Sequence, residues 1–314
     1  MKKLAKIFDL DINNDSWWGF INQSVDAFEL LIKSIFNKHG LVYSKAENLP
    51  GVNAVFKVGN KVIKIFAPVE SGCYGADYYE IETEALNHAN NVQVASPKLL
   101  YKGIIHDKYI FRYIIMEFIY GQIAERKVAS LTENEKRTFS AKLRNITNKL
   151  NVNMQSAIIP VKSRETCLSN DRWRKDYSER FCDERIDIIK EMSFDDLVYV
   201  HGDIHSKNII IDSNDAIYLT DFAASSIAPY YCEWYAIAFL LFKCNPVMMS
   251  AYFGDYRNEK FYNQLTKSIL IYDTIAVKEI CEAMAVNTST LIDVSKLKEL
   301  IICCLEDGNV EIKY

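Results

Sequence analysis

The sequence contains little proline, glycine or histidine, and none of these residue types is clustered. There are 6 prolines, 11 glycines and 5 histidines in 314 residues. No proline-rich or glycine-rich linker, low-complexity tract or internal repeat is present, so nothing indicates a string of separate modules. The 8 cysteines form no C-x-x-C pair. We therefore expect reduced thiols, and neither a zinc ribbon nor a thioredoxin-type motif.

An excess of positive charge and long apolar runs are also absent. The formal net charge is -4, without the basic excess that favours nucleic acid or an anionic membrane. The longest apolar runs, such as residues 234–242, are far shorter than the ~20 residues of a membrane-spanning helix. Lys2, Lys3 and Lys6 precede acidic residues and not the apolar segment of a signal peptide. We expect a cytoplasmic protein with no nucleic-acid or membrane partner, and no pattern specifies its oligomeric state.

The first 118 residues change from helical to β-type periodicity near residue 42. Residues 17–38 have apolar positions at helical spacing, including Phe20, and the Trp17-Trp18 pair is interpreted as a packing anchor. The expected strands are 42–43, 54–58, 62–66, 98–102 and 109–118, and the expected helix is 77–90. This order predicts a small antiparallel sheet with one helix docked on it.

The remainder of the chain is mostly helical. Thr132 and Glu135 form a capping-box pattern that begins a helix through about residue 150. Further helices are expected over 171–191 and within 230–306, and a β island over 197–200, 208–212 and 216–219. Because domains typically contain roughly 100–200 residues, we predict an α+β protein with two lobes. The expected parts are an N-terminal helical extension (1–40), a first lobe (41–118) and a second lobe (119–314).

Carboxylate and amide side chains gather at the ends of the β island. An apolar strand leads into His201, Gly202 and Asp203. Asn208 then begins the second strand of the island, and Asp221 follows the third. Phosphoryl transfer needs one carboxylate that accepts the proton of the attacking hydroxyl, and further oxygen ligands that hold Mg²⁺ against the phosphates. The segment therefore predicts phosphotransferase chemistry.

The pattern H-G-D-x-x-x-x-N followed by D-F resembles the catalytic and metal-binding loops of the aminoglycoside phosphotransferase/choline kinase superfamily, relatives of protein kinases. Residues 53–59, 62–66, 221–224 and 232–234 are most similar to the hygromycin-type aminoglycoside phosphotransferases. The resemblance covers roughly residues 44–255 and implies a bilobal protein-kinase-like fold that binds ATP and Mg²⁺. It implies that Asp203 is the catalytic base and that Asn208 and Asp221 are the Mg²⁺ ligands.

The resemblance also implies roles in the first lobe, which would bind the nucleotide. A cation is needed on the third strand and an acid on the following helix. Lys64 lies on an apolar strand, where lysine is out of character, and Glu82 precedes a packing leucine as in the family. Lys57 and Lys61, and Glu80 and Glu84, are the other candidates.

Three further features follow from the resemblance. Gly51 and Asn53 belong to the turn that would cover the phosphates, although no G-x-G-x-x-G is present. Met116, Glu117 and Phe118 resemble the hinge that binds the adenine edge, and the flexible Met116 side chain favours ATP over GTP. Glu233 corresponds to a structural acid that braces the catalytic region, and Asn151 stands where many members have histidine.

The acceptor is expected to be a small molecule with a hydroxyl group. Gly202 replaces the arginine that binds a phosphorylated activation loop in many protein kinases, and Pro229 follows Asp221 too soon for a peptide platform. The resemblance favours an aminoglycoside, and hence antibiotic resistance. Residues 165–187 and 306–311 supply acids for a polycation, but basic residues alternate with the acids of 165–187, which favours a salt-bridged surface.

Three alternatives stay open. A metabolic kinase for choline, a sugar or an amino alcohol would use the same fold, and Tyr230, Tyr231 and Trp234 offer rings for a quaternary ammonium group. A non-catalytic pseudokinase would bind nucleotide alone. The string His201, Asp203 and His205 fits a metal-dependent hydrolase, which would need further ligands from other strands.

Overall fold

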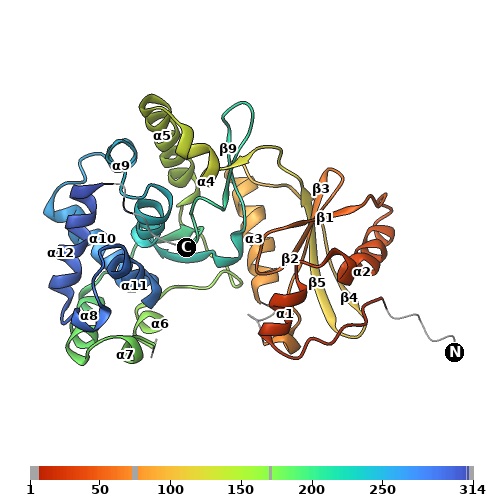
Figure 1. Cartoon of the computed structure of the whole chain (residues 1–314), viewed down its shortest axis with the longest axis horizontal. Coiled ribbons are helices and arrows are strands. Elements are labelled where there is room, and N and C mark those ends of the chain that lie inside the picture. Colours follow the sequence, from red (N-terminus) through yellow and green to blue (C-terminus); the bar gives the residue numbers. More distant parts are fainter. Residues whose placement is uncertain (1–6, 73–76, 170–171, 309, 311–314) are drawn as a thin grey trace. The chain divides into compact units, whose positions relative to one another are not determined.

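The computed structural model describes residues 7–72, 77–169, 172–308 and 310, which form two compact units (Figure 1). The first unit contains the described residues of Met1–Asn91, Ala95–Tyr120 and Phe222–Ala224. The second contains the described residues of Val92–Val94, Gly121–Asp221 and Ser225–Tyr314. The chain thus passes from the second unit to the first between Asp221 and Phe222.

The first unit is built on a five-stranded antiparallel sheet with the order β1-β2-β3-β5-β4. The strands are β1 (Ala46–Leu49), β2 (Ala54–Val58), β3 (Lys61–Ile65), β4 (Leu99–His106) and β5 (Ile110–Glu117). The helices are α1 (Asp15–Ile21), α2 (Val25–Lys38) and α3 (Asp77–Asn91), with short 3-10 turns η1 (Val69–Ser71) and η3 (Phe222–Ala224). The predicted small antiparallel sheet with a docked helix is confirmed.

Opposite faces of this sheet have different roles, because successive side chains of a strand point to opposite sides. Phe56, Ile63 and Tyr113 belong to a buried core that also contains Phe28 and Phe36 of α2. Lys64 points to the other face, on which α3 lies (Figure 1). The N-terminal helices therefore close the apolar face and leave the opposite face for the predicted nucleotide-binding groups.

One prediction about this unit was wrong and another gains detail. Residues 17–38 are mainly helical, as expected, and belong to the two helices α1 and α2, because Ser24 caps α2 by accepting a hydrogen bond from Ala27 N (3.3 Å). Phe20 is 81% exposed on α1. The expected strand at 42–43 is absent from the described structure, where Tyr43 instead packs against the core and donates a hydrogen bond to Glu29. The periodicity of the sequence does not indicate the Ser24 cap or the contacts that Tyr43 makes with the core and with Glu29.

The second unit is mainly helical around short strands, as predicted. Its helices are α4 (Ala124–Lys127), α5 (Glu133–Leu150), α6 (Arg164–Leu168), α7 (Trp173–Asp176), α8 (Glu179–Glu191), α9 (Pro246–Phe253), α10 (Glu259–Tyr272), α11 (Thr274–Ala283) and α12 (Val294–Asp307). Shorter turns are η2 (Val128–Ser130), η4 (Tyr230–Glu233), the π-helical η5 (Ala236–Leu241) and η6 (Thr288–Thr290). The strands are β6 (Gln122–Ile123), β7 (Leu197–Val200), β8 (Ile209–Ile211), β9 (Ile217–Leu219) and β10 (Ser226–Pro229), in the sheets β6-β8-β9 and β10-β7.

Helix termini in the second unit follow their caps. The predicted capping box of Thr132 and Glu135 is confirmed at the start of α5. The helix expected over 171–191 is divided into α7 and α8, because Ser178 caps α8 by accepting a hydrogen bond from Phe181 N (3.2 Å). No described helix in either unit is long and apolar enough to cross a membrane.

Candidate active site

The loop that follows β7 is fixed by His201, which is fully buried. Its Nδ1 accepts a hydrogen bond from Asp203 N (3.3 Å), so the ring proton lies on Nε2, which donates to Thr220 O (3.1 Å). Burial lowers the pKa of His201 and keeps the ring neutral. His201 therefore has a structural role, because both ring nitrogens bond backbone atoms and connect this loop to the residue after β9.

Two neighbouring side chains orient the carboxylate of Asp203. The amide nitrogen of Asn208 donates to Asp203 Oδ2 (2.8 Å) and to Asp203 O (3.1 Å). His205 accepts a hydrogen bond from Lys207 N at Nδ1 (3.1 Å), which leaves its proton on Nε2, 3.3 Å from Asp203 Oδ2. The Asp203 side chain stays 26% exposed. Its carboxylate is thus held in one orientation and remains open to a reactant.

Asn208 and Asp221 are brought together by the pairing of β8 with β9. Ile209 lies opposite Leu219, and Thr220 extends the ladder by donating its N–H to Asn208 O (2.9 Å). Asp221 follows in the left-handed region (φ 60°), which Asp tolerates better than most residues. Amide and carboxylate oxygens at this position fit Mg²⁺, which usually takes one or two protein ligands and its remaining ligands from water and phosphates. Among the described side chains, no group of three or more His, Cys, Asp or Glu residues could hold a metal ion.

A buried acid supports the same loop from behind. Glu233 accepts hydrogen bonds from Gly202 N (2.9 Å) and from the side-chain amide of Asn151 (3.2 Å), and burial raises the pKa of Glu233 to about 7. Gly202 has φ 83°, a conformation that glycine adopts without strain. Asn151 also donates to Tyr199 O (2.9 Å), so it joins Glu233 to β7. The sequence suggested the brace at Glu233 but gave Asn151 no role; its only signal was a polar residue directly after the amphipathic α5.

In the first unit, Lys64 and Glu82 form a buried ion pair. Lys64 Nζ lies 2.6 Å from Glu82 Oε2, and the two side chains are 5% and 1% exposed. Lys57 lies at the surface, 3.6 Å from Glu47, and Lys61 bonds the neighbouring side chain. The geometry therefore selects Lys64 among the three candidate lysines, and Glu82 among the acids of α3.

The turn between β1 and β2 is anchored by α1 and the residue that follows it. Trp18 Nε1 donates to Val52 O (2.8 Å), and the side-chain amide of Asn22 donates to the carbonyls of Gly51 (3.2 Å) and Val52 (2.8 Å). Asn53 is fixed separately, because its Oδ1 accepts a backbone hydrogen bond (3.2 Å). Of the pair predicted as a packing anchor, Trp18 is 1% exposed and packs in the core, whereas Trp17 is 50% exposed and does not. The bonds of Trp18 and Asn22 to the turn were not foreseen from the sequence.

The predicted hinge residues lie at the end of β5. Met116 is buried opposite Val62 on β3. Glu117 N donates to Lys98 O (3.1 Å) and Phe118 N donates to Asn60 O (3.1 Å). Because both N–H groups are already bonded within the unit, an adenine ring would have to contact carbonyl groups here or the residues that follow.

The predicted site residues thus fall into two sets. Gly51, Asn53, Lys64, Glu82, Met116, Glu117 and Phe118 belong to the first unit, and Asp203, Asn208 and Asp221 to the second. In the first unit the Lys64–Glu82 pair joins β3 to α3, and Met116 lies opposite Val62 on β3. In the second unit the Asn208–Asp203 hydrogen bond and the pairing of β8 with β9 bring the three residues to one end of that sheet. A family model described as the phosphotransferase enzyme family (APH) matches residues 53–256, which include all but Gly51. The chain belongs to this phosphotransferase family.

Solved structures agree with this assignment at the level of the fold. The phosphotransferase is similar to the GDP complex of an aminoglycoside 2'-phosphotransferase-IIIa (17% identity, TM-score 0.58, 88% of this chain and 98% of that one). It is also similar to a ternary complex of the aminoglycoside phosphotransferase APH(4)-Ia with ADP and hygromycin B (14% identity, TM-score 0.55, 89% and 99%). A GDP and kanamycin complex of APH(2")-IIia matches at 18% identity and a TM-score of 0.59, covering 88% of this chain and 98% of that one. No curated protein matches.

The charged stretch of residues 165–187 in the phosphotransferase is mostly a surface network. Arg174 pairs with Asp183 (2.8 Å) and Arg180 with Glu184 (3.0 Å), all four side chains being largely exposed. The interpretation as a salt-bridged surface is confirmed for these residues, whereas Arg185 is buried. Two of the acids proposed for a polycationic acceptor, Asp171 and Glu311, lie outside the described residues.

Proposed function

We propose that the chain transfers the γ-phosphoryl group of ATP to a hydroxyl of a small-molecule acceptor. The observation that carries the proposal is the Asp203 carboxylate, which Asn208 and His205 hold in one orientation while it stays open to a reactant. Asp203 would accept the proton of the acceptor hydroxyl as its oxygen bonds to the γ-phosphorus. The bond from that phosphorus to the β,γ-bridging oxygen breaks, and ADP leaves with the electron pair.

The remaining groups would bind and position the nucleotide. Lys64, oriented by Glu82, would bind the α- and β-phosphates. The turn of Gly51 and Asn53 would cover the phosphates, and the hinge at Met116, Glu117 and Phe118 would hold adenine. Asn208 and Asp221 would hold Mg²⁺, which when bound supplies positive charge to the phosphates.

An aminoglycoside-like compound is the first acceptor to test, because kanamycin and hygromycin B occupy two of the similar structures. A metabolic acceptor is the second. For choline, the rings of Tyr230, Tyr231 and Trp234 contact one another edge-on, and Trp234 also stacks on Phe261 (5.2 Å). These rings pack on one another and do not form an open cage, although Tyr230 is 47% exposed, which favours a sugar or another hydroxyl compound over a quaternary ammonium ion.

The test is ATP turnover against a panel of aminoglycosides, choline and sugars, with Asp203→Ala as the first variant. We expect turnover with one acceptor class to fall about 10²–10⁴-fold, while nucleotide affinity stays within a factor of two. Asp196→Ala, which removes an exposed acid of the same unit, should retain full activity. Nucleotide binding without turnover for every acceptor would favour the pseudokinase alternative, and equal loss in both variants would contradict the role of Asp203.

A further inference from the structure

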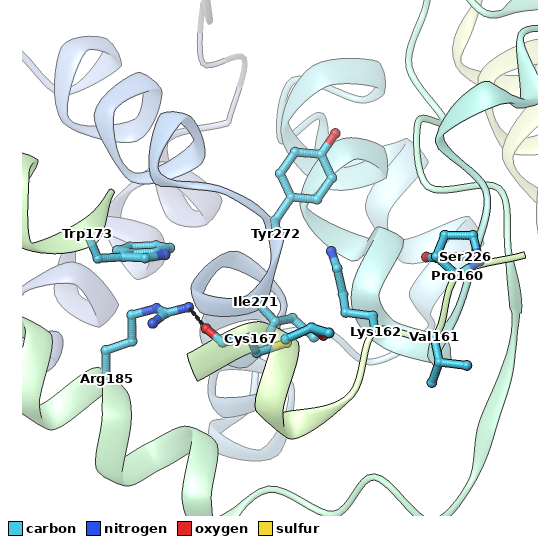
Figure 2. A pocket seen from close by; sticks show the side chains of 10 residues that line it. Pro160, Val161, Lys162, Cys167, Trp173, Arg185, Ser226, Ile271 and Tyr272 are labelled. Carbon is cyan, nitrogen blue, oxygen red and sulfur yellow. Dashed lines mark hydrogen bonds between the residues drawn. The ribbon is translucent and has the colours of Figure 1, made fainter. Parts of the chain in front are cut away.

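A cavity of about 270 Å³ lies in the second unit, between α6, α7, α8, the end of α10 and the start of β10 (Figure 2). The polar side chains that line it are mainly hydrogen-bond donors. They are Lys162, Thr166, Trp173, Arg185, Ser226 and Tyr272. No carboxylate occurs among the described residues that form its wall. The described residues of the lining thus carry positive charge from Lys162 and Arg185.

Arg185 is the most buried of these charges, with 3% of its surface exposed. Nε donates to Leu270 O (2.9 Å) and Nη2 to Cys167 O (2.8 Å), which are carbonyls in the last turns of α10 and α6. These bonds use two of the five N–H donors of a guanidinium. The indole of Trp173 lies over the same group, 4.1 Å from the guanidinium carbon to the ring centre (Figure 2). The charge of Arg185 is thus stabilised by two carbonyl dipoles and the Trp173 ring, and not by a carboxylate.

Trp173 supplies a second, independent indication of a ligand. Its side chain is 2% exposed, and its Nε1–H is buried without a hydrogen-bond partner in the described structure. A buried donor that lacks an acceptor destabilises the folded protein, so an N–H in a cavity wall is a place where an acceptor from a ligand would be stabilised. An oxyanion is such an acceptor, and the adjacent guanidinium favours one that is charged.

Lys162 provides the third donor from another segment. Its Nζ lies 3.5 Å from Cys232 Sγ and 5.9 Å from the ring centre of Tyr272. Burial raises the pKa of Cys232, so the sulfur is a neutral thiol and not a counter-charge. The cavity therefore combines two cations with an indole donor, a set that complements a carboxylate or a phosphate group.

The cavity is close to the loop of Asp203. Ser226 on β10 lies opposite Val200, the last residue of β7 and three positions before Asp203. A cross-strand neighbour is ~5 Å away, and three residues reach at most about 11 Å. The Cα atoms of Ser226 and Asp203 are thus no more than about 16 Å apart, so the cavity lies in the same region of the second unit as the Asp203 loop.

We propose that this cavity binds an anionic group, carboxylate or phosphate, of the phosphoryl acceptor. The assignment to the acceptor rests on the proposed function, whereas the anion site does not. A polycation would be repelled by Lys162 and Arg185 at this position. The acceptor is thus a small hydroxyl compound that carries negative charge, so between the two candidate acceptor classes this cavity favours a metabolic acceptor over an aminoglycoside.

The anion site is tested by calorimetric titration of the whole protein with inorganic phosphate and with citrate, in the absence of nucleotide. We expect binding that weakens at least 10-fold in Lys162→Met and at least 3-fold in Trp173→Phe, which keeps the ring and removes only the N–H. Lys260→Met removes an exposed charge about 18 Å along α10 from Tyr272, and should bind as the wild type does. Absence of binding, or equal weakening in Lys260→Met, would overturn the proposal.

The acceptor assignment is tested with sugars that share a skeleton and differ in charge. We expect turnover of glucuronate or glucose 6-phosphate to exceed that of glucose, and glucosamine to be the poorest. The preferred anionic sugar distinguishes a carboxylate from a phosphate site, and its KM should rise in Trp173→Phe with little change in kcat. A preference for glucosamine, unaffected by Lys162→Met, would overturn the assignment. Failure of all ATP turnover would refute the proposed function and the acceptor role, while the anion site would stand on the titration.

Discussion

Lys64 in the first unit and Arg185 in the second are both buried cations, with 4% and 3% of their surfaces exposed. Lys64 has a full counter-charge, since Glu82 lies 2.6 Å away. Arg185 has two backbone carbonyls and an indole ring instead. The fold therefore neutralises Lys64 with a carboxylate, whereas no carboxylate is bonded to Arg185. A lysine that positions nucleotide phosphates must be held in place by its counter-ion. An arginine that binds an anionic ligand is more effective when no protein carboxylate neutralises it.

The largest effect should come from removing the counter-charge of Lys64. Glu82→Gln leaves a buried ammonium beside a neutral amide, and breaking a buried pair in this way costs about 3–5 kcal/mol. The free energy of unfolding of the whole protein, obtained from urea titration, should be lower by this amount. Glu80→Gln, an exposed acid of the same helix, should have little effect. Equal losses of stability in the two variants would contradict a specific role of Glu82 in stabilising the buried Lys64.

Glu233 extends the comparison to a buried acid. Like Arg185, it has no oppositely charged partner among its bonded neighbours. Burial raises the pKa of Glu233 from 4.5 to about 7. Between these values the unfolded carboxyl ionises while the folded one keeps its proton, so the native state binds more protons. Its contribution to stability is complete below pH 4.5 and is lost as the pH rises through 7, about 3 kcal/mol in total. Unfolding free energies of wild type and Glu233→Gln, compared from pH 4 to 8, should diverge in this window, and parallel curves would contradict the assignment.

A smaller effect is expected when Arg185 is replaced. Arg185→Met loses two charge-assisted bonds to helix carbonyls but also removes a desolvated charge that has no acid partner, so we expect a cost of about 1–3 kcal/mol. Arg174→Met, which breaks the exposed pair with Asp183, is the matched control and should change stability little. A loss of stability as large as that of Glu82→Gln would show that the two backbone carbonyls stabilise Arg185 as fully as a carboxylate would.

The contrast also separates what sequence patterns could and could not predict. Lys64, Glu82 and the loop of Asp203 were found because a lysine on an apolar strand and the H-G-D spacing are local signals. Arg185 could not be found, since it alternates with acids in a stretch that resembles a solvated helix face. Only the packing of α6 and α10 against α8, distant in sequence, buries it.

Other parts of the site were missed for the same reason. Trp18 and Asn22 support the turn at Gly51 across about thirty residues of sequence, and Asn151 supports Glu233 across a longer separation. Hydrogen bonds of this kind depend on how elements dock, which periodicity does not encode. The small antiparallel sheet of the first unit was predictable because most of its paired strands follow each other along the chain, whereas the pairing of β3 with β5 spans α3 and β4 and was not predicted.

The smallest change in stability should come from replacing both members of the buried pair. Lys64→Met combined with Glu82→Leu removes the desolvation cost of two ions together with their attraction, and such replacements are often neutral or stabilising. We expect a free energy of unfolding within about 1 kcal/mol of the wild type, while phosphoryl transfer is lost because the buried cation proposed to hold the phosphates is removed and Lys61, at the surface end of β3, bonds Asn60 instead. A double variant as unstable as Glu82→Gln would mean that the pair is needed for folding. A stable but inactive double variant would mean that the pair serves nucleotide binding and not stability.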